Sequence, residues 1–136
     1  MTVVDASVWV AYFIITDAHH MVSNRWLREQ LHVYDELVAA PTLLLPEVGG
    51  AIARRSGNTV LGQDAVLEMR QLPELKLVPI DEKLASEAAS LATTLRLRGA
   101  DAVYVATAQA LSVPLITWDE ELAERAKPVV EVRQPR

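Results

Sequence analysis

The sequence predicts a three-layer α/β domain, in which helices cover both faces of a central parallel sheet. Short apolar runs alternate with segments of helical periodicity along the whole chain. Residues 101–111 are apolar nearly all round, which is typical of a helix buried against a sheet. The 136 residues match the length of one ordinary domain, so we expect a single domain over residues 1–136.

The first predicted elements are a strand, a helix and a second strand. Residues 2–5 form a short apolar run that ends in an acid, which predicts a buried strand. Residues 17–31 carry apolar side chains at helical spacing and predict an amphipathic helix. Residues 37–40 predict the second strand, which we expect Pro41 to stop.

Two helices are expected after the second strand. Thr42 is the predicted N-cap of the first, which runs to Arg55 and closes at residues 56–58. Residues 63–72 predict the other, which ends before Pro73.

The clearest helical pattern lies in the middle of the chain. Residues 75–80 predict a strand, and Asp81 is expected to cap the helix after it. The apolar residues of this helix recur at i, i+4, i+7 and i+11. We expect Gly99 to end it.

The last part of the chain continues the alternation. Residues 114–117 predict a strand, and residues 117–120 have the capping-box spacing for a helix that runs to about Ala126. Residues 129–132 predict the final strand. Parallel sheets of this kind bind ligands at the carboxyl ends of their strands.

The composition excludes several kinds of chemistry. The chain has no cysteine, so it forms no disulfide, thiolate zinc site or cysteine nucleophile. A net charge of −5 argues against a general basic surface that grips DNA, although ten of the 13 basic residues are arginine, the residue that binds phosphate most specifically. No basic leader and no long uncharged apolar run occur, so we expect a cytoplasmic protein that does not span a membrane.

Four carboxylates fall where such sheets bind ligands. Asp5 ends the first strand, and Asp119 follows the strand at 114–117. Glu47 lies about one turn into a predicted helix, and Asp101 opens another. Each also has a structural explanation, because acids form Asx-turns, cap helices and favour the positive helix N-terminus.

The surroundings of these acids favour a shared site. Apolar residues flank Glu47 and Asp101, and an ionised carboxylate in such surroundings needs a partner charge. No Lys or Arg is adjacent to Asp5, Glu47 or Asp101 in the sequence. Converging acids would therefore repel one another unless a cation lay among them, and hard divalent cations prefer such oxygen ligands.

The order and spacing of the four acids resemble the PIN-domain ribonucleases. The resemblance covers residues 3–132, and the size is similar to that of VapC-type toxins of bacterial and archaeal toxin–antitoxin modules. The matching segments are VVDASVWV at 3–10, PEV at 46–48, GADA at 99–102 with Ala106 and Ala108 following, and PLITWD at 114–119.

The resemblance implies an endoribonuclease that depends on Mg²⁺ or Mn²⁺ and hydrolyses RNA phosphodiester bonds. It places Asp5, Glu47, Asp101 and Asp119 around the metal. We expect Asp5 and Asp101 to be direct ligands. Glu47 and Asp119 are expected either to be ligands or to orient or deprotonate bound waters.

Two hydroxyl residues match positions that flank the metal in this family. Ser7 and Thr117 are expected to hydrogen-bond the acids or their waters. Thr117 fits a helix cap equally well, because Glu120 follows three residues later. Three histidines lie in polar surroundings without ligand spacing and have no expected role: His19, His20 and His32.

Other residues are candidates for contact with RNA. Trp118 either packs at a strand end or stacks on a base. Four arginines near predicted helix C-termini either complement the helix dipoles or bind phosphates: Arg54, Arg55, Arg96 and Arg98.

The resemblance also implies a partner, an antitoxin protein that inhibits the nuclease. We expect it to lay a segment in the substrate groove, with a basic side chain reaching the acids. We also expect a homodimer, because the early helices carry more apolar surface than one sheet face covers. The residues concerned are Trp9, Tyr12, Phe13, Trp26 and Leu27.

Three other functions are compatible with parts of the pattern. Haloacid-dehalogenase-like phosphatases need a second acid two residues after the nucleophile, where this chain has Ser7. Receiver-like domains have paired acids near the first strand and a late lysine, whereas Val4 precedes Asp5 and Lys127 follows no suitable strand. The third alternative is a catalytically inactive PIN-fold module that binds or scaffolds other molecules, which the presence of all four acids disfavours.

Overall fold

The computed structural model describes residues 1–136 as one five-stranded sheet surrounded by helices. The strand order is β3-β2-β1-β4-β5, and every neighbouring pair is parallel. The predicted three-layer α/β fold is therefore confirmed. The strands are β1 (Thr2–Val4), β2 (Val38–Pro41), β3 (Leu75–Val78), β4 (Leu115–Ile116) and β5 (Val132–Arg133).

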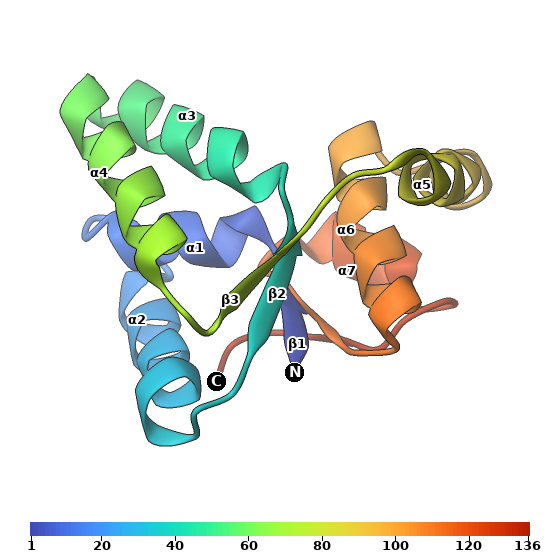
Figure 1. The fold of residues 1–136 in the computed structure, drawn as a ribbon, viewed down its shortest axis with the longest axis horizontal. Helices are drawn as coiled ribbons and strands as arrows, with labels where there is room; N and C mark the ends of the chain where they lie inside the picture. The colour runs from blue at the N-terminus through green and yellow to red at the C-terminus, as the bar shows by residue number, and fades with distance from the viewer.

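The helices form the two outer layers (Figure 1). On one side of the sheet lie α1 (Ala6–Phe13), α2 (His20–Arg28), α3 (Leu44–Ser56) and α4 (Thr59–Gln71). On the other side lie α5 (Glu82–Leu95), α6 (Gly99–Leu111) and α7 (Glu120–Ala126). Both chain ends lie at the same edge of the molecule, opposite the carboxyl ends of the strands.

The core lies where α1 and α6 enclose the central strand. Val3 and Val4 of β1 are fully buried, and Trp9 and Tyr104 are the largest buried side chains. Helix α6 contacts β1, β2 and β4, and residues 104–108 are all buried. The prediction that this apolar helix packs against the sheet is confirmed.

Several helix ends differ from the predictions. Asp81 caps α5 as predicted, its Oδ1 accepting a hydrogen bond from the Leu84 N–H at 2.8 Å. Asn58 caps α4 in the same way, so that helix begins at residue 59 and not at 63. Thr42 is not a side-chain cap; its backbone carbonyl accepts from Leu45 at 3.3 Å.

The predicted stop at Gly99 is wrong, because this glycine opens α6. Helix α5 ends at Leu95, where Arg96 adopts a left-handed φ of 57°. The predicted helix over residues 17–31 begins later, at His20, and widens after Arg28 into a π-helical turn, η1 (Glu29–Val33).

Helix α1 was not predicted. It follows β1 after a single residue, Asp5, and most of its side chains are apolar. The sequence pattern therefore does not separate it from the strand before it. A helix this short also gives too few turns for a reliable helical period. None of the helices is long and apolar enough to cross a membrane.

Candidate active site

The four acids predicted as site residues all lie at the carboxyl edge of the sheet. Asp5 follows β1, and Glu47 lies in the first turn of α3, the helix after β2. Asp101 lies in the first turn of α6, and Asp119 is the N-cap of α7, after β4. In the sheet, β2 lies on one side of β1 and β4 lies on the other, so the strand order changes direction at β1. This edge is therefore the topological switch point, where α/β sheets bind ligands.

Asp5 is held in one orientation by hydrogen bonds. It is buried, and its Oδ2 accepts from the Thr117 hydroxyl at 2.9 Å and from the Ser7 N–H at 3.3 Å. Burial raises the pKa of Asp5 above its ordinary value, these hydrogen bonds oppose the shift, and the charge of Asp101 adds to it. Asp5 is thus both the cap of α1 and a destabilised carboxylate at the switch point.

The hydroxyls of Ser7 and Thr117 join the acids to the turn before α7. Thr117 is fully buried, donates to Asp5 and accepts from the Asp119 N–H at 3.0 Å. The Ser7 hydroxyl lies 3.4 Å from that of Thr117 and accepts from the Trp118 N–H at 3.1 Å. Of the two predictions for Thr117, the structure supports contact with the acids, because Asp119 caps the helix.

Glu47 presents an unsatisfied oxygen to the site. Its Oε1 is buried and has no hydrogen-bond partner. Burial raises the pKa of Glu47, the nearby Tyr104 hydroxyl lowers it, and the charges of Asp5 and Asp101 raise it further. Glu47 is thus within electrostatic range of both Asp5 and Asp101.

Tyr104 was missed in the sequence. Its hydroxyl is buried and forms no hydrogen bond, although it lies near the Glu47 carboxylate. Burial raises the pKa of Tyr104 far above its ordinary value, and Glu47, Asp5 and Asp101 add to the shift. The signal was a lone phenol about one turn after Asp101 in a mostly apolar helix.

Arg98 bridges the remaining acids. Its Nε donates to Asp101 Oδ2 at 3.1 Å and its Nη2 to Asp119 Oδ2 at 3.4 Å. Burial raises the pKa of Asp101, and Arg98 opposes that shift. No base is adjacent to Asp101 in the sequence, but Arg98, three residues before it, is its basic partner in the fold. The guanidinium is largely exposed, with 80% of its side chain accessible, so its ion pairs form at the rim of the site.

The donor set fits a hard divalent cation. All the donors are oxygens of carboxylates and hydroxyls, and the buried, unpartnered Oε1 of Glu47 is what a missing cation would leave. No three acidic or histidine side chains are already arranged to coordinate an ion directly.

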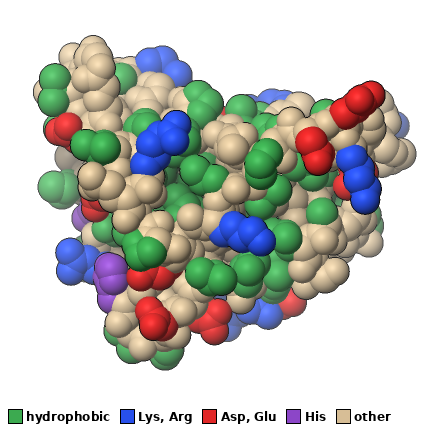
Figure 2. All heavy atoms as spheres, in the orientation of Figure 1, with side chains coloured by type: hydrophobic (Ala, Val, Ile, Leu, Met, Phe, Trp, Pro, Cys, Tyr) green, Lys and Arg blue, Asp and Glu red, His purple; other side chains and the backbone are tan.

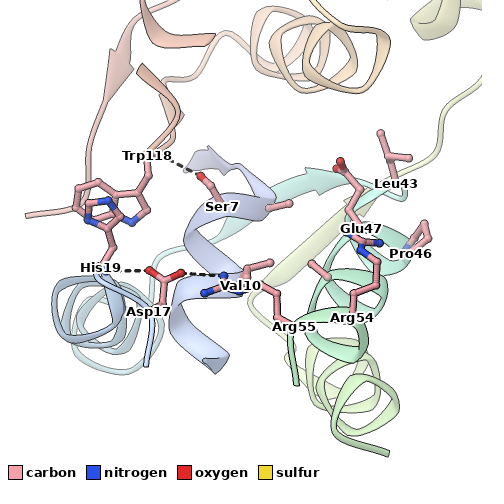
Figure 3. A pocket seen from close by; sticks show the side chains of 12 residues that line it. Ser7, Val10, Asp17, His19, Leu43, Pro46, Glu47, Arg54, Arg55 and Trp118 are labelled. Atoms are coloured by element: carbon pink, nitrogen blue, oxygen red, sulfur yellow. Dashed lines mark hydrogen bonds and ion pairs between the residues drawn. The ribbon is translucent and has the colours of Figure 1, made fainter. Parts of the chain in front are cut away.

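A cavity of about 610 Å³ opens between α1 and α3 (Figure 3), and Glu47 is the one of the four acids that lines it. Ser7 and Glu47 line it together with two of the candidate arginines, Arg54 and Arg55. Arg96 does not line the cavity; it caps the end of α5, where its carbonyl accepts from Arg125.

The chain is a three-layer α/β domain whose four candidate acids lie around the switch point of its sheet. The PIN domain family model matches residues 2–128, so the chain belongs to the PIN-domain family. The predicted resemblance to this family is thereby confirmed.

Solved structures share this fold. VapC20 of Mycobacterium tuberculosis, described as a sarcin-ricin-loop-cleaving toxin, has a TM-score of 0.77 at 21% identity, covering 98% of this chain and 99% of that one. FitAcB of Neisseria gonorrhoeae has a TM-score of 0.73 at 23% identity, covering 99% and 98%. VapBC2 of Rickettsia felis, bound to a promoter DNA fragment, has a TM-score of 0.71 at 15% identity, covering 98% and 97%. A search of curated proteins finds no significant match.

Proposed function

We propose that this PIN-domain protein is a metal-dependent endoribonuclease and the toxin of a type II toxin–antitoxin pair. One observation carries the proposal: Asp5, Glu47 and Asp101 all lie at the carboxyl edge of the sheet around its switch point, where burial and the charges of other acids raise the pKa of each. Holding unfavourable charges together costs stability, which favours a catalytic role over a structural one. An inactive scaffold would have no need of them.

The acids of this chain would hold Mg²⁺ or Mn²⁺, with Asp5 and Asp101 as ligands and Glu47 and Asp119 completing the site. When bound, the ion would polarise the phosphate and activate the attacking water. Thr117 keeps the Asp5 carboxylate in place through its 2.9 Å hydrogen bond.

The proposed reaction is hydrolysis of an RNA phosphodiester. Water adds to phosphorus, the bond from phosphorus to the 3′ oxygen breaks, and the products are a 5′-phosphate and a 3′-hydroxyl. Glu47 is suited to take the proton of the attacking water, because burial raises its pKa and so makes it a stronger base, and its Oε1 has no competing partner.

RNA would be bound by a few local contacts. Figure 2 shows Lys and Arg side chains scattered singly among other residues, with no continuous basic patch on this face. Arg54 and Arg55 line the cavity beside Glu47, and Arg98 could exchange its carboxylate partners for phosphate once metal binds. Arg96 lies outside the cavity, so we propose that it contacts only a longer substrate.

We also propose an antitoxin partner. Solved relatives include a toxin–antitoxin complex from Klebsiella pneumoniae, with a TM-score of 0.70 at 18% identity over 100% of this chain and 98% of that one. In this chain, Arg98 already shows that a guanidinium can lie between two of the site acids. A basic residue of an inhibitor segment could bind the acids in the same manner.

The proposed homodimer has less support than the sequence suggested. Trp9 and Leu27 are buried in the core, and Tyr12, Phe13 and Trp26 are partly buried. Exposed apolar residues nevertheless remain near them, Ile15 at 80% and Met21 at 82%. Light scattering at tens of micromolar protein tests the dimer, and a monomer would refute it.

Cleavage assays and growth test the enzymatic proposal. The parent protein should cut RNA with Mn²⁺ and stop in EDTA, and its expression in the bacterial cytoplasm should arrest growth. Asp5→Asn should abolish cleavage and relieve the arrest. Asp64→Asn, at an exposed position on α4, is the matched control and should remain toxic. If the Asp5→Asn protein is as toxic as the parent, Asp5 is not catalytic.

A further inference from the structure

Two stacked rings form one wall of the cavity beside Glu47. The His19 imidazole lies parallel to the Trp118 indole, with ring centroids 4.0 Å apart and an interplanar angle of 9°. Figure 3 shows this pair on one side of the cavity, with Glu47, Leu43 and Pro46 on the other. The stack and Glu47 thus lie on opposite sides of the same cavity.

Trp118 is fixed at both its backbone and its ring. Its N–H donates to the Ser7 hydroxyl at 3.1 Å, and its Nε1–H donates to the Ser23 hydroxyl at 2.8 Å. Ser23 is fully buried in α2, so the second hydrogen bond anchors the indole to the core. Because Trp118 lies between Thr117 and Asp119, the ring is held in a constant position relative to the acids.

His19 is exposed but its backbone is also held. Its N–H donates to Asp17 Oδ1 at 2.8 Å, while Asp17 Oδ2 accepts from Arg55 at 2.9 Å. Only Trp118 stacks on the imidazole, and no second aromatic ring covers its other face. Because His19 is exposed, the pair presents a planar aromatic surface that another ring can reach.

The same cavity holds a guanidinium without a carboxylate partner. Arg55 is paired with Asp17, whereas Arg54 is exposed and forms no ion pair or hydrogen bond. A planar stacking surface and an unpaired guanidinium beside a catalytic acid match the two parts of a nucleotide, a base and a phosphate. An apolar peptide side chain would pair with neither the guanidinium nor the exposed imidazole.

We propose that the His19–Trp118 stack binds one unpaired base of the RNA, with Arg54 on a neighbouring phosphate. This inference rests on the proposed ribonuclease function. The volume of about 610 Å³ is within the range of pockets that enclose small ligands. Bases in a duplex are already stacked on one another, so the subsite selects single-stranded or looped RNA.

Binding of RNA without cleavage tests the proposal. Fluorescence anisotropy in EDTA would measure the dissociation constant of a short labelled single-stranded RNA and of an abasic chain of equal length. His19→Ala should raise Kd for the normal RNA about tenfold and leave Kd for the abasic chain unchanged, as expected for the loss of one base–aromatic stack. His19→Phe should bind like the parent, because it keeps a stacking ring.

Two further variants separate base contact from charge. His32→Ala, at an exposed position on η1, is the matched control and should bind both chains like the parent. Arg54→Ala should weaken both chains equally and lower the salt dependence of binding, as loss of a phosphate contact does.

The outcomes also separate this inference from the proposed function. If the parent cleaves RNA with Mn²⁺ but His19→Ala binds normal RNA unchanged, the base subsite is refuted and the nuclease stands. If His19→Ala spares RNA but releases a co-expressed antitoxin, the stack is a protein-binding surface and the inference is wrong. If the parent neither binds nor cleaves RNA, both proposals fail.

Discussion

The Thr117 hydroxyl donates a hydrogen bond to the Asp5 carboxylate at 2.9 Å, although the two residues lie 112 positions apart in the sequence. It joins the end of β1 to the turn after β4, the two strands that meet at the switch point. The fold and the site are thus coupled, because the group that orients Asp5 also pairs with the backbone of Asp119.

Thr117→Val should destabilise the protein, because it keeps the side-chain shape and leaves the buried Asp5 carboxylate with only the longer hydrogen bond from the Ser7 N–H. We expect a loss of about 1–3 kcal/mol in the free energy of unfolding, measured by urea denaturation in EDTA. Thr117→Ser should recover most of it. Thr107→Val is the matched control, since Thr107 is equally buried but bonds only a carbonyl of its own helix. Equal losses for the two valine variants would contradict the role assigned to Thr117.

The raised pKa of Asp5 predicts how stability depends on pH in the absence of metal. Between the ordinary value of 3.8 and the raised pKa, the folded protein binds more protons than the unfolded chain. Its stability therefore falls as pH rises through this range, and the penalty is fully present above it. Asp5→Asn lacks this penalty. The free energy of unfolding of the variant minus that of the parent should therefore increase from acid to neutral pH.

Urea denaturation at a series of pH values in EDTA measures this difference. Comparing variant with parent cancels the other groups that titrate in the same range. Asp64→Asn, exposed on α4, should follow the parent curve throughout. If the Asp5→Asn protein instead loses stability relative to the parent toward neutral pH, the buried carboxylate is not destabilising.

The fold class and the four acids were predictable because they depend on local patterns. Apolar runs and helical periods are recognised within a few residues, and an acid at a strand end lies at the carboxyl edge in any parallel sheet. Helix α1 was not predictable in this way, because Ala6–Phe13 is short and mostly apolar and continues a strand. The early start of α4 was missed for a similar reason, since Asn58 follows a helix and also caps the next one.

The contacts around the acids depend on the tertiary fold. In the sequence, Tyr104 is one more residue of an apolar helix, and only its buried hydroxyl near Glu47 marks it. Arg98 is a residue near a predicted helix end, whereas its guanidinium reaches Asp119, 21 positions away. The His19–Trp118 stack joins a loop and a strand end that no sequence pattern connects.

Helices α3 and α4 pack through two glycines, which gives a prediction independent of the site. A Cβ at Gly62 would lie 2.6 Å from the Gly49 carbonyl oxygen and 3.2 Å from the Ala53 Cβ. Gly62→Ala should therefore destabilise the protein by about 1–3 kcal/mol, although alanine favours a helix by about 0.5–1 kcal/mol. Thermal and urea unfolding measure the loss. Gly99→Ala is the control: a Cβ at Gly99 has open space around it and should not lower the free energy of unfolding. A Gly62→Ala protein as stable as the parent would show that the helices can separate.

The response to metal tests the acid cluster as a whole. Asp101 does not cap α6, since Arg98 occupies the N-cap position without a side-chain hydrogen bond, so Asp101→Asn loses no cap. In EDTA this variant should be as stable as the parent or more so, because it relieves the repulsion that burial makes costly. Mn²⁺ at about 100 times its dissociation constant should stabilise the parent by roughly 2.7 kcal/mol, a rise in Tm on the order of 10 °C.

The Asp101→Asn protein should respond to Mn²⁺ much less, because it has lost a ligand and with it most of the affinity. Arg98→Ala supplies the opposite case: without the guanidinium between Asp101 and Asp119, the acids have no competing cation, so this variant should bind Mn²⁺ more tightly than the parent. Melting curves of the three proteins in EDTA and across a Mn²⁺ titration provide the measurement. A parent melting curve that does not shift with Mn²⁺ would refute the metal site. An Arg98→Ala protein that binds the ion more weakly than the parent would show that Arg98 supports the metal and does not compete with it.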